Sequence, residues 1–127
     1  MSQNYLSHVA FILDGNKRWA KNKKFNKIQG YKKGFENIKK IVEFSINKKI
    51  SNLTMFTLSS ENLERTSVKI LYEIIDKNFE SLFDELINTK KIRINIFGSR
   101  NNIPNKIVKV FEKAEKLSCS NSVLNLN

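Results

Sequence analysis

The chain has 127 residues, 40% of them hydrophobic, which is enough to build one domain with a real core. Four glycines, one proline and 28% charged residues exclude a fibrous or low-complexity chain, and a single cysteine excludes an intramolecular disulfide. No apolar stretch approaches the roughly 18 residues of a membrane span and no signal-peptide core is seen, so a cytoplasmic location is expected.

The charge of the chain is unevenly distributed. The formal net charge is +11, and residues 1–49 carry twelve Lys and Arg against three acidic residues. Such an excess favours a polyanionic partner: a nucleic acid, an anionic membrane surface or a phosphorylated substrate. Compositional bias explains the same excess, because Lys, Asn and Ile are all abundant, so charge alone does not choose among these partners.

Apolar periodicity predicts an alternation of strands and helices. Val9–Leu13 and Leu53–Leu58 are short apolar runs, as in strands that are covered on both faces. Between them, apolar residues at three- and four-residue spacing predict an amphipathic helix over Lys33–Lys48. A further helix is predicted over Ser67–Asn88, where one wide apolar stripe contains Leu71, Ile74, Ile75, Phe79, Leu82, Phe83 and Leu86.

The last third of the chain continues the alternation. Ile92–Phe97 reads as a third strand, and Pro104 suits the first turn of a last helix. The buried face of that helix is predicted to carry Ile107, Phe111, Ala114 and Leu117. Ser122–Leu126 then begins a fourth strand. This order predicts an α/β fold with a mostly parallel sheet and helices on both faces.

Polar clusters follow the first two predicted strands. Asp14 and Gly15 come where the first strand ends, and residues 59–62 come where the second ends. Ligands of open parallel sheets bind outside the carboxyl ends of the strands, so both clusters are expected to face one crevice. The glycine spacings of a P-loop and of a dinucleotide-binding turn are absent.

The first cluster suits a metal-linked diphosphate. Gly15 permits close backbone approach, and a helix that begins near Asn16 or Lys17 would direct free N–H groups toward an anion. A carboxylate at Asp14 makes sense there if Mg²⁺ bridges it to the phosphate. The alternative is structural: Asp14 is a helix N-cap and the lysines are a solvated face, while "SSENLER" is a capped loop.

Three segments together carry a family resemblance. "HVAFILDGNKRWAK", "GYKKGFENIKKIV" and "TLSSENLER" resemble the cis-prenyltransferases, the undecaprenyl diphosphate synthase family, over about residues 8–127. The resemblance implies an enzyme that uses Mg²⁺ to extend an allylic diphosphate, such as farnesyl diphosphate, with isopentenyl diphosphate units. It also implies a parallel-sheet homodimer with an apolar tunnel, membrane contact only through the lipid product, and no nucleic acid partner.

The resemblance further implies roles for individual residues. Asp14 would be the catalytic carboxylate and the Mg²⁺ ligand, and Asn62 would assist removal of the isopentenyl proton. The substrate-binding residues that it implies are Gly15, Asn16, Lys17, Arg18, Trp19, Lys27, Ser59, Ser60, Glu61 and Arg65. Phe79 and Phe83 would be ordinary core residues or part of the tunnel wall.

The chain departs from the family pattern at several positions. Lys17, Lys27, Tyr31 and Leu63 stand where glycine, arginine, histidine and an aromatic residue are usual, which bears on rate and substrate choice more than on fold. The C-terminal portion of the family, which supplies the isopentenyl diphosphate site and much of the dimer interface, has no counterpart here. The expectation is therefore a single partial domain over residues 1–127, with an open strand edge and little activity alone.

The sequence is compatible with two other function classes. A non-catalytic relative that serves as a partner subunit is the better rival, although it has no physical need for Asp14, Asn16, Arg18 and Asn62. A basic nucleic-acid-binding module is less favoured, because no helix-turn-helix, zinc or RNP pattern is present.

Overall fold

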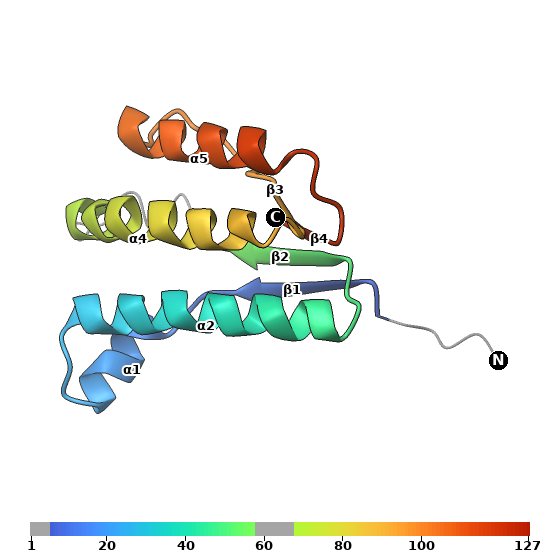
Figure 1. Ribbon diagram of the computed structural model, residues 1–127. Helices are drawn as coiled ribbons and strands as arrows, with labels where there is room; N and C mark the ends of the chain where they lie inside the picture. The colour runs from blue at the N-terminus through green and yellow to red at the C-terminus, as the bar shows by residue number, and fades with distance from the viewer. Residues whose placement is uncertain (1–5, 58–67) are drawn as a thin grey trace.

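The computed structural model describes residues 6–57 and 68–127 as alternating strands and helices (Figure 1). In chain order the elements are β1 His8–Ile12, α1 Asn16–Asn22, α2 Lys27–Asn47, β2 Asn52–Phe56, α4 Val68–Asn88, β3 Ile92–Ile94, α5 Asn105–Ser118 and β4 Leu124–Leu126. The predicted alternation is confirmed. The largest difference in bounds is at α2, which begins at Lys27 rather than at Lys33.

The four strands form one parallel sheet in the order β1-β2-β4-β3, so the last strand lies between the second and the third. Val9 pairs with Leu53, Leu53 with Leu126, and Leu126 with Ile94. Paired positions share a face of a sheet, so one face carries this apolar row. The mostly parallel sheet expected from the sequence is confirmed.

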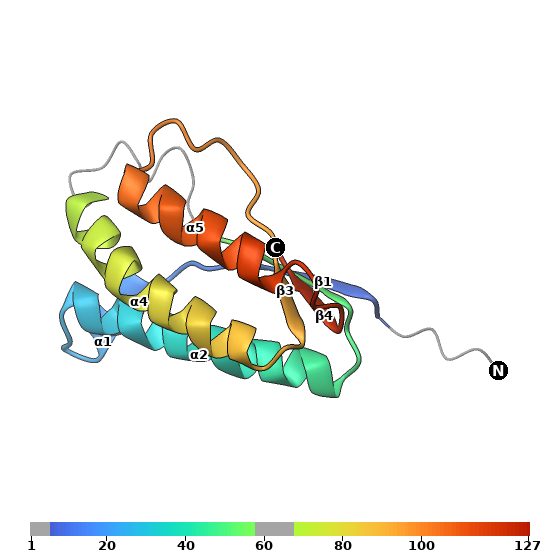
Figure 2. The same ribbon diagram turned by 45° about the horizontal axis from the view of Figure 1, so that its top comes forward.

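The long helices α2, α4 and α5 lie side by side in one layer over the apolar face (Figures 1 and 2). Their buried hydrophobic residues join those of the strands in one core: Ile38 and Val42 from α2, Phe79, Leu82, Phe83 and Leu86 from α4, and Ile107, Phe111 and Ala114 from α5. Phe79 contacts the rings of Phe35, Phe83 and Phe111 with centroids 4.9, 5.2 and 6.0 Å apart. Phe79 and Phe83 are thus core residues of this chain. The predicted stripe on α4 also includes Leu71, Ile74 and Ile75, whose side chains lie outside the described residues.

Helices on both faces were expected, but Figures 1 and 2 show no helix against the opposite face of the sheet within residues 6–57 and 68–127. Polar side chains bond to one another across this face. Asn95 Nδ2 donates to Asn127 Oδ1 at 3.0 Å, Asn127 Nδ2 donates to Thr54 Oγ1 at 3.2 Å, and His8 Nε2 lies 2.8 Å from Thr54 Oγ1. The helices gather on the other face, which carries the buried strand residues Leu53, Ile92, Ile94, Leu124 and Leu126.

Helix α5 covers the outer edge of β3. Ser118 Oγ accepts a hydrogen bond from the Ile94 N–H at 2.9 Å, and Glu115 Oε1 accepts one from the Ile96 N–H at 2.8 Å. These side chains take the place of a neighbouring strand. Leu117, expected on the buried face of this helix, is 53% exposed, and Ser118 is fully buried instead.

Strand β1 forms the other edge of the sheet and pairs with β2 alone among the described strands. Phe11 and Ile12 on this strand are 39% and 78% exposed. The open strand edge expected from the sequence is therefore present. In the described ranges, no helix has both the length and the hydropathy needed to cross a membrane.

Candidate functional site

The first polar cluster lies in a tight turn at the carboxyl end of β1, where the chain enters α1 (Figure 1). Gly15 has φ +91° and ψ −1°, a left-handed conformation that favours glycine. The Trp19 N–H donates to the Gly15 carbonyl at 2.9 Å and closes the first turn of α1, which begins at Asn16. The helix start predicted near Asn16 or Lys17 is confirmed.

The carboxylate of Asp14 is exposed and shared between two donors. Its Oδ1 accepts from the Gly15 N–H at 2.6 Å, and its Oδ2 accepts from Arg18 Nη2 at 3.2 Å. The N-cap of α1 is Gly15 and no side chain caps the helix, so the alternative in which Asp14 is the N-cap is wrong. The side chains of Asp14 and Arg18 are 75% and 77% exposed, which leaves both charges open to a ligand.

The remaining residues of the first cluster lie on α1 and at the start of α2. Asn16 and Lys17 are half-buried, and Trp19 is 36% exposed with its ring centroid 5.7 Å from that of Phe25. Trp19 is therefore a surface residue rather than part of the core. Lys27 is exposed at the first residue of α2. The turn thus brings residues 14–18 together, whereas Lys27 lies outside the turn, at the start of α2.

The second predicted cluster, Ser59, Ser60, Glu61, Asn62 and Arg65, lies outside the described residues. The strand that leads to it is described: β2 runs parallel to β1 and beside it, with Ile12 paired to Phe56. The Leu13 N–H donates to the Phe56 carbonyl at 3.2 Å, so the two strands stay together up to their carboxyl ends. Contact between Asp14 and Asn62 remains a prediction.

The donor set around Asp14 decides what kind of metal site is feasible. Within the described ranges, no three His, Cys, Asp or Glu side chains gather as a metal cage would require. Mg²⁺ usually keeps several waters and binds through one or two carboxylates together with substrate phosphates. A carboxylate offers about four lone-pair positions, and hydrogen bonds from Gly15 and Arg18 use two. A single exposed carboxylate with free lone pairs therefore fits an ion that arrives with a diphosphate.

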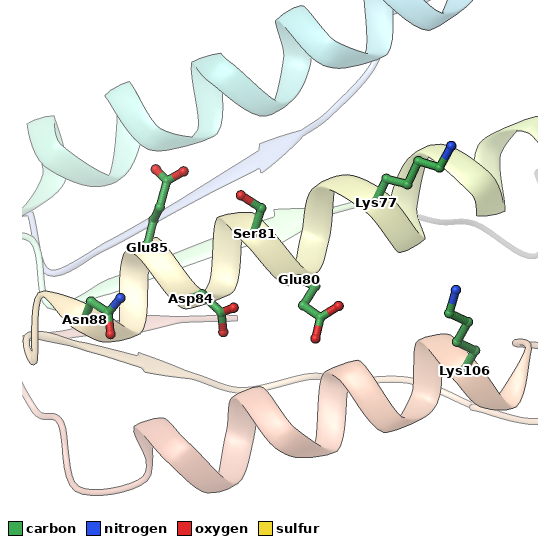
Figure 3. A pocket seen from close by; sticks show the side chains of 7 residues that line it. All are labelled: Lys77, Glu80, Ser81, Asp84, Glu85, Asn88 and Lys106. Atoms are coloured by element: carbon green, nitrogen blue, oxygen red, sulfur yellow. The ribbon is translucent and has the colours of Figure 1, made fainter.

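A surface groove of about 520 Å³ lies elsewhere, along α4 and α5 (Figure 3). Its lining is polar and contains none of the predicted site residues: Lys77, Glu80, Ser81, Asp84, Glu85, Asn88 and Lys106. Glu80 pairs with Lys113 at 3.4 Å, and Glu85 pairs with Lys39. The groove is an ion-paired helix surface, and such exposed pairs are ordinary features of helical layers.

Two glycines that the sequence motifs did not assign to the site face the cluster. A Cβ added at Gly30 would lie 2.4 Å from the Asn16 carbonyl oxygen, and one added at Gly34 would lie 2.9 Å from Asn16 Oδ1. The available signal was their four-residue spacing inside a helix, which places both on one face.

Comparison with known proteins identifies the family of the chain. The family model described as "Putative undecaprenyl diphosphate synthase" matches residues 12–127. A farnesyl-diphosphate-specific ditrans,polycis-undecaprenyl-diphosphate synthase of Wigglesworthia glossinidia brevipalpis is 39% identical over 94% of this chain and 46% of its own length. A geranylgeranyl-diphosphate-specific tritrans,polycis synthase of Pyrobaculum aerophilum is 34% identical over 88% of this chain and 49% of its own.

Solved structures show the same fold. Lavandulyl diphosphate synthase from Lavandula x intermedia, solved with dimethylallyl diphosphate, superposes with a TM-score of 0.88 at 27% identity, covering 96% of this chain and 53% of that one. A probable undecaprenyl diphosphate synthase from Campylobacter jejuni gives a TM-score of 0.76 at 21% identity, covering 98% of this chain and 54% of that one. This chain spans about half the length of the relatives that it matches. It belongs to the undecaprenyl diphosphate synthase family of cis-prenyltransferases.

Proposed function

We propose that this chain acts in the condensation of an allylic diphosphate, farnesyl diphosphate or a similar primer, with isopentenyl diphosphate to make a long cis-polyprenyl diphosphate. The turn at residues 14–18 would bind the allylic diphosphate. The observation that carries the proposal is the exposed Asp14–Arg18 pair beside a left-handed glycine, at the carboxyl end of a parallel strand. The names of the relatives, which specify farnesyl or geranylgeranyl diphosphate, support this substrate class.

The residues of the turn suit charge stabilisation of a diphosphate. The guanidinium of Arg18 is exposed and 3.2 Å from Asp14, so it can turn to phosphate oxygens and bind two of them at once. Gly15 has no side chain to hold the diphosphate away from the main chain, and Lys17 would contribute its backbone N–H. Fixed positive groups at the departing diphosphate would be the main catalytic contribution, with general-base help smaller.

Asp14 would hold Mg²⁺ on the diphosphate, and the ion when bound would supply further positive charge there. By the family resemblance, Ser59, Ser60, Glu61 and Arg65 would border the substrates, and Asn62 would assist removal of the isopentenyl proton. These five residues belong to the segment outside the described ranges, so their roles rest on the resemblance.

The larger assembly is also proposed. Since the chain spans about half of its relatives, we propose that it is one partial domain with little or no turnover alone, in a cytoplasmic enzyme that is a homodimer when complete. The open edge of β1 and the helix-free face of the sheet support a missing partner layer. Membrane contact would be peripheral, through the lipid product.

The rival proposal is a non-catalytic partner subunit. That role does not explain the exposed Asp14–Arg18 pair at the turn.

The test is binding of a thio-linked farnesyl diphosphate analogue by the 127-residue chain, with and without Mg²⁺. Asp14→Ala should weaken the Mg²⁺-dependent binding about tenfold or more, since a charge-assisted contact contributes about 1.5–3 kcal/mol. Glu43→Ala, an exposed acid on α2, is the matched control and should bind like the parent chain. Equal binding by the parent chain and Asp14→Ala would refute the proposed site. Robust incorporation of labelled isopentenyl diphosphate would refute the proposed inactivity.

A further inference from the structure

Helix α1 rests on α2 at two glycines. Gly30 is buried and Gly34 is half-buried, and their four-residue spacing puts them on the same face of α2, one turn apart. Both positions face Asn16, the first residue of α1. The contact therefore lies directly behind the turn that carries Asp14 and Gly15.

The two glycines face different parts of Asn16. A Cβ at Gly30 would meet the carbonyl oxygen of Asn16 at 2.4 Å and the Cβ of Ala20 at 2.9 Å, both of which are rigid parts of α1. A Cβ at Gly34 would meet only the side chain of Asn16: Oδ1 at 2.9 Å, Nδ2 at 3.0 Å and Cγ at 3.2 Å. Gly30 thus sets the distance between the helices, whereas Gly34 makes room for one amide group.

We propose that Gly34 is a positioning residue: by leaving this space it holds the side-chain amide of Asn16 in the orientation that binds the diphosphate. The inference rests on the proposed function, in which Asn16 belongs to the allylic diphosphate site. The amide has two N–H donors, which suit phosphate oxygens. An amide seated against α2 has fewer orientations to lose on binding than one that projects into solvent.

A double-mutant cycle separates this role from general packing. In Gly34→Ala the amide of Asn16 must turn away while α1 stays in place, because only the end of a flexible side chain is displaced. The thermal midpoint should be unchanged or higher, since alanine has the higher helix propensity. Binding of the thio-linked farnesyl diphosphate analogue should weaken about tenfold, as in Asn16→Ala. Gly34→Ala should cause no further loss in an Asn16→Ala background, because both changes remove the same contact.

Gly30→Ala is the contrasting variant. It presses on the backbone of α1, so it should lower the thermal midpoint, which Gly34→Ala should not do. The side-chain amide signal of Asn16 in a ¹⁵N NMR spectrum of the ligand-free chain gives a readout that does not depend on binding. Gly34→Ala should shift this signal while most backbone signals of α1 stay unchanged.

The outcomes distinguish the inference from the proposed function. If Asn16→Ala binds the analogue as the parent chain does, the assignment of Asn16 to the diphosphate site fails. If Asn16→Ala weakens binding and Gly34→Ala does not, the positioning role is overturned. An unshifted Asn16 amide signal in Gly34→Ala overturns that role whatever the binding results.

Discussion

Replacing Ser118 by alanine removes the hydroxyl that satisfies the outer edge of β3. Ser118 is fully buried, and its Oγ accepts from the Ile94 N–H at 2.9 Å while it donates to the Ala114 carbonyl at 2.7 Å. In Ser118→Ala the Ile94 N–H stays buried beneath α5 and loses its partner. Leaving a buried donor unsatisfied costs about 1–3 kcal/mol.

Ser45 provides a matched control on α2. It is also buried, and its Oγ donates to the Ile41 carbonyl four residues back at 2.7 Å, the same local bond that Ser118 makes to Ala114. The structure shows no strand N–H bonded to Ser45 in the described part of the chain. Ser45→Ala gains about 0.5 kcal/mol of helix propensity inside α2, and Ser118→Ala gains less because Ser118 is the last residue of α5, so propensity does not offset the expected difference. Ser118→Ala should therefore be less stable than Ser45→Ala by about 1–3 kcal/mol.

Urea unfolding measures this difference. With an m-value of about 2 kcal/mol/M, the midpoint of Ser118→Ala should lie about 0.5–1.5 M below that of Ser45→Ala. Amide hydrogen exchange should also become faster at Ile94 in Ser118→Ala, because the amide has lost its acceptor. Coincident midpoints, together with unchanged protection of the Ile94 amide, would refute the interpretation of α5 as the cover of the β3 edge.

Two further predictions concern α2. Asn26 Oδ1 accepts from the Gln29 N–H and Gln29 Oε1 accepts from the Asn26 N–H, both at 2.9 Å, so Asn26→Ala should lower stability by about 1 kcal/mol in urea unfolding. The mid-helix control Asn37→Ala should not, and an equal loss in both would contradict the cap. The hydrogen bond and the charge of Lys33 hold the pKa of Glu36 below its usual 4.5, so this stabilisation is full above pH 4.5 and is lost as the pH falls through the lower folded value. Titration of the Glu36 carboxyl by ¹³C NMR should give a value under 4.5, and Lys33→Ala should return it toward 4.5.

The start of α2 shows what apolar periodicity misses. The apolar stripe begins at Phe35, so the sequence predicted a helix from Lys33. The helix nevertheless begins at Lys27, because the capping box at Asn26 fixes its first turn and α1 packs on the glycines. A capping pattern in the sequence could have been used, whereas the packing against α1 could not.

Neither the order of the strands nor the burial of Ser118 could be predicted from the sequence. Nothing local in the sequence places β4 between β2 and β3, because strand order depends on contacts between distant segments. On α5 the apolar spacing favoured Leu117, but the position that faces β3 belongs to Ser118. A hydroxyl is needed there because an edge N–H must be satisfied, and a hydrophobic pattern carries no information about that requirement.

The charged side chains of the turn after β1 contribute little to the stability of the fold. An exposed ion pair such as Asp14–Arg18 contributes about 0–1 kcal/mol, and its 75% and 77% exposure places it at the low end of that range. The course of the chain is set instead by the left-handed Gly15 and by the close contact of Asn16 with Gly30. Because the exposed charges of Asp14 and Arg18 contribute little to stability, the proposed binding of a charged ligand is the better explanation for their place at the carboxyl end of a parallel strand. If so, affinity for the ligand and stability of the fold can be changed separately at Asp14.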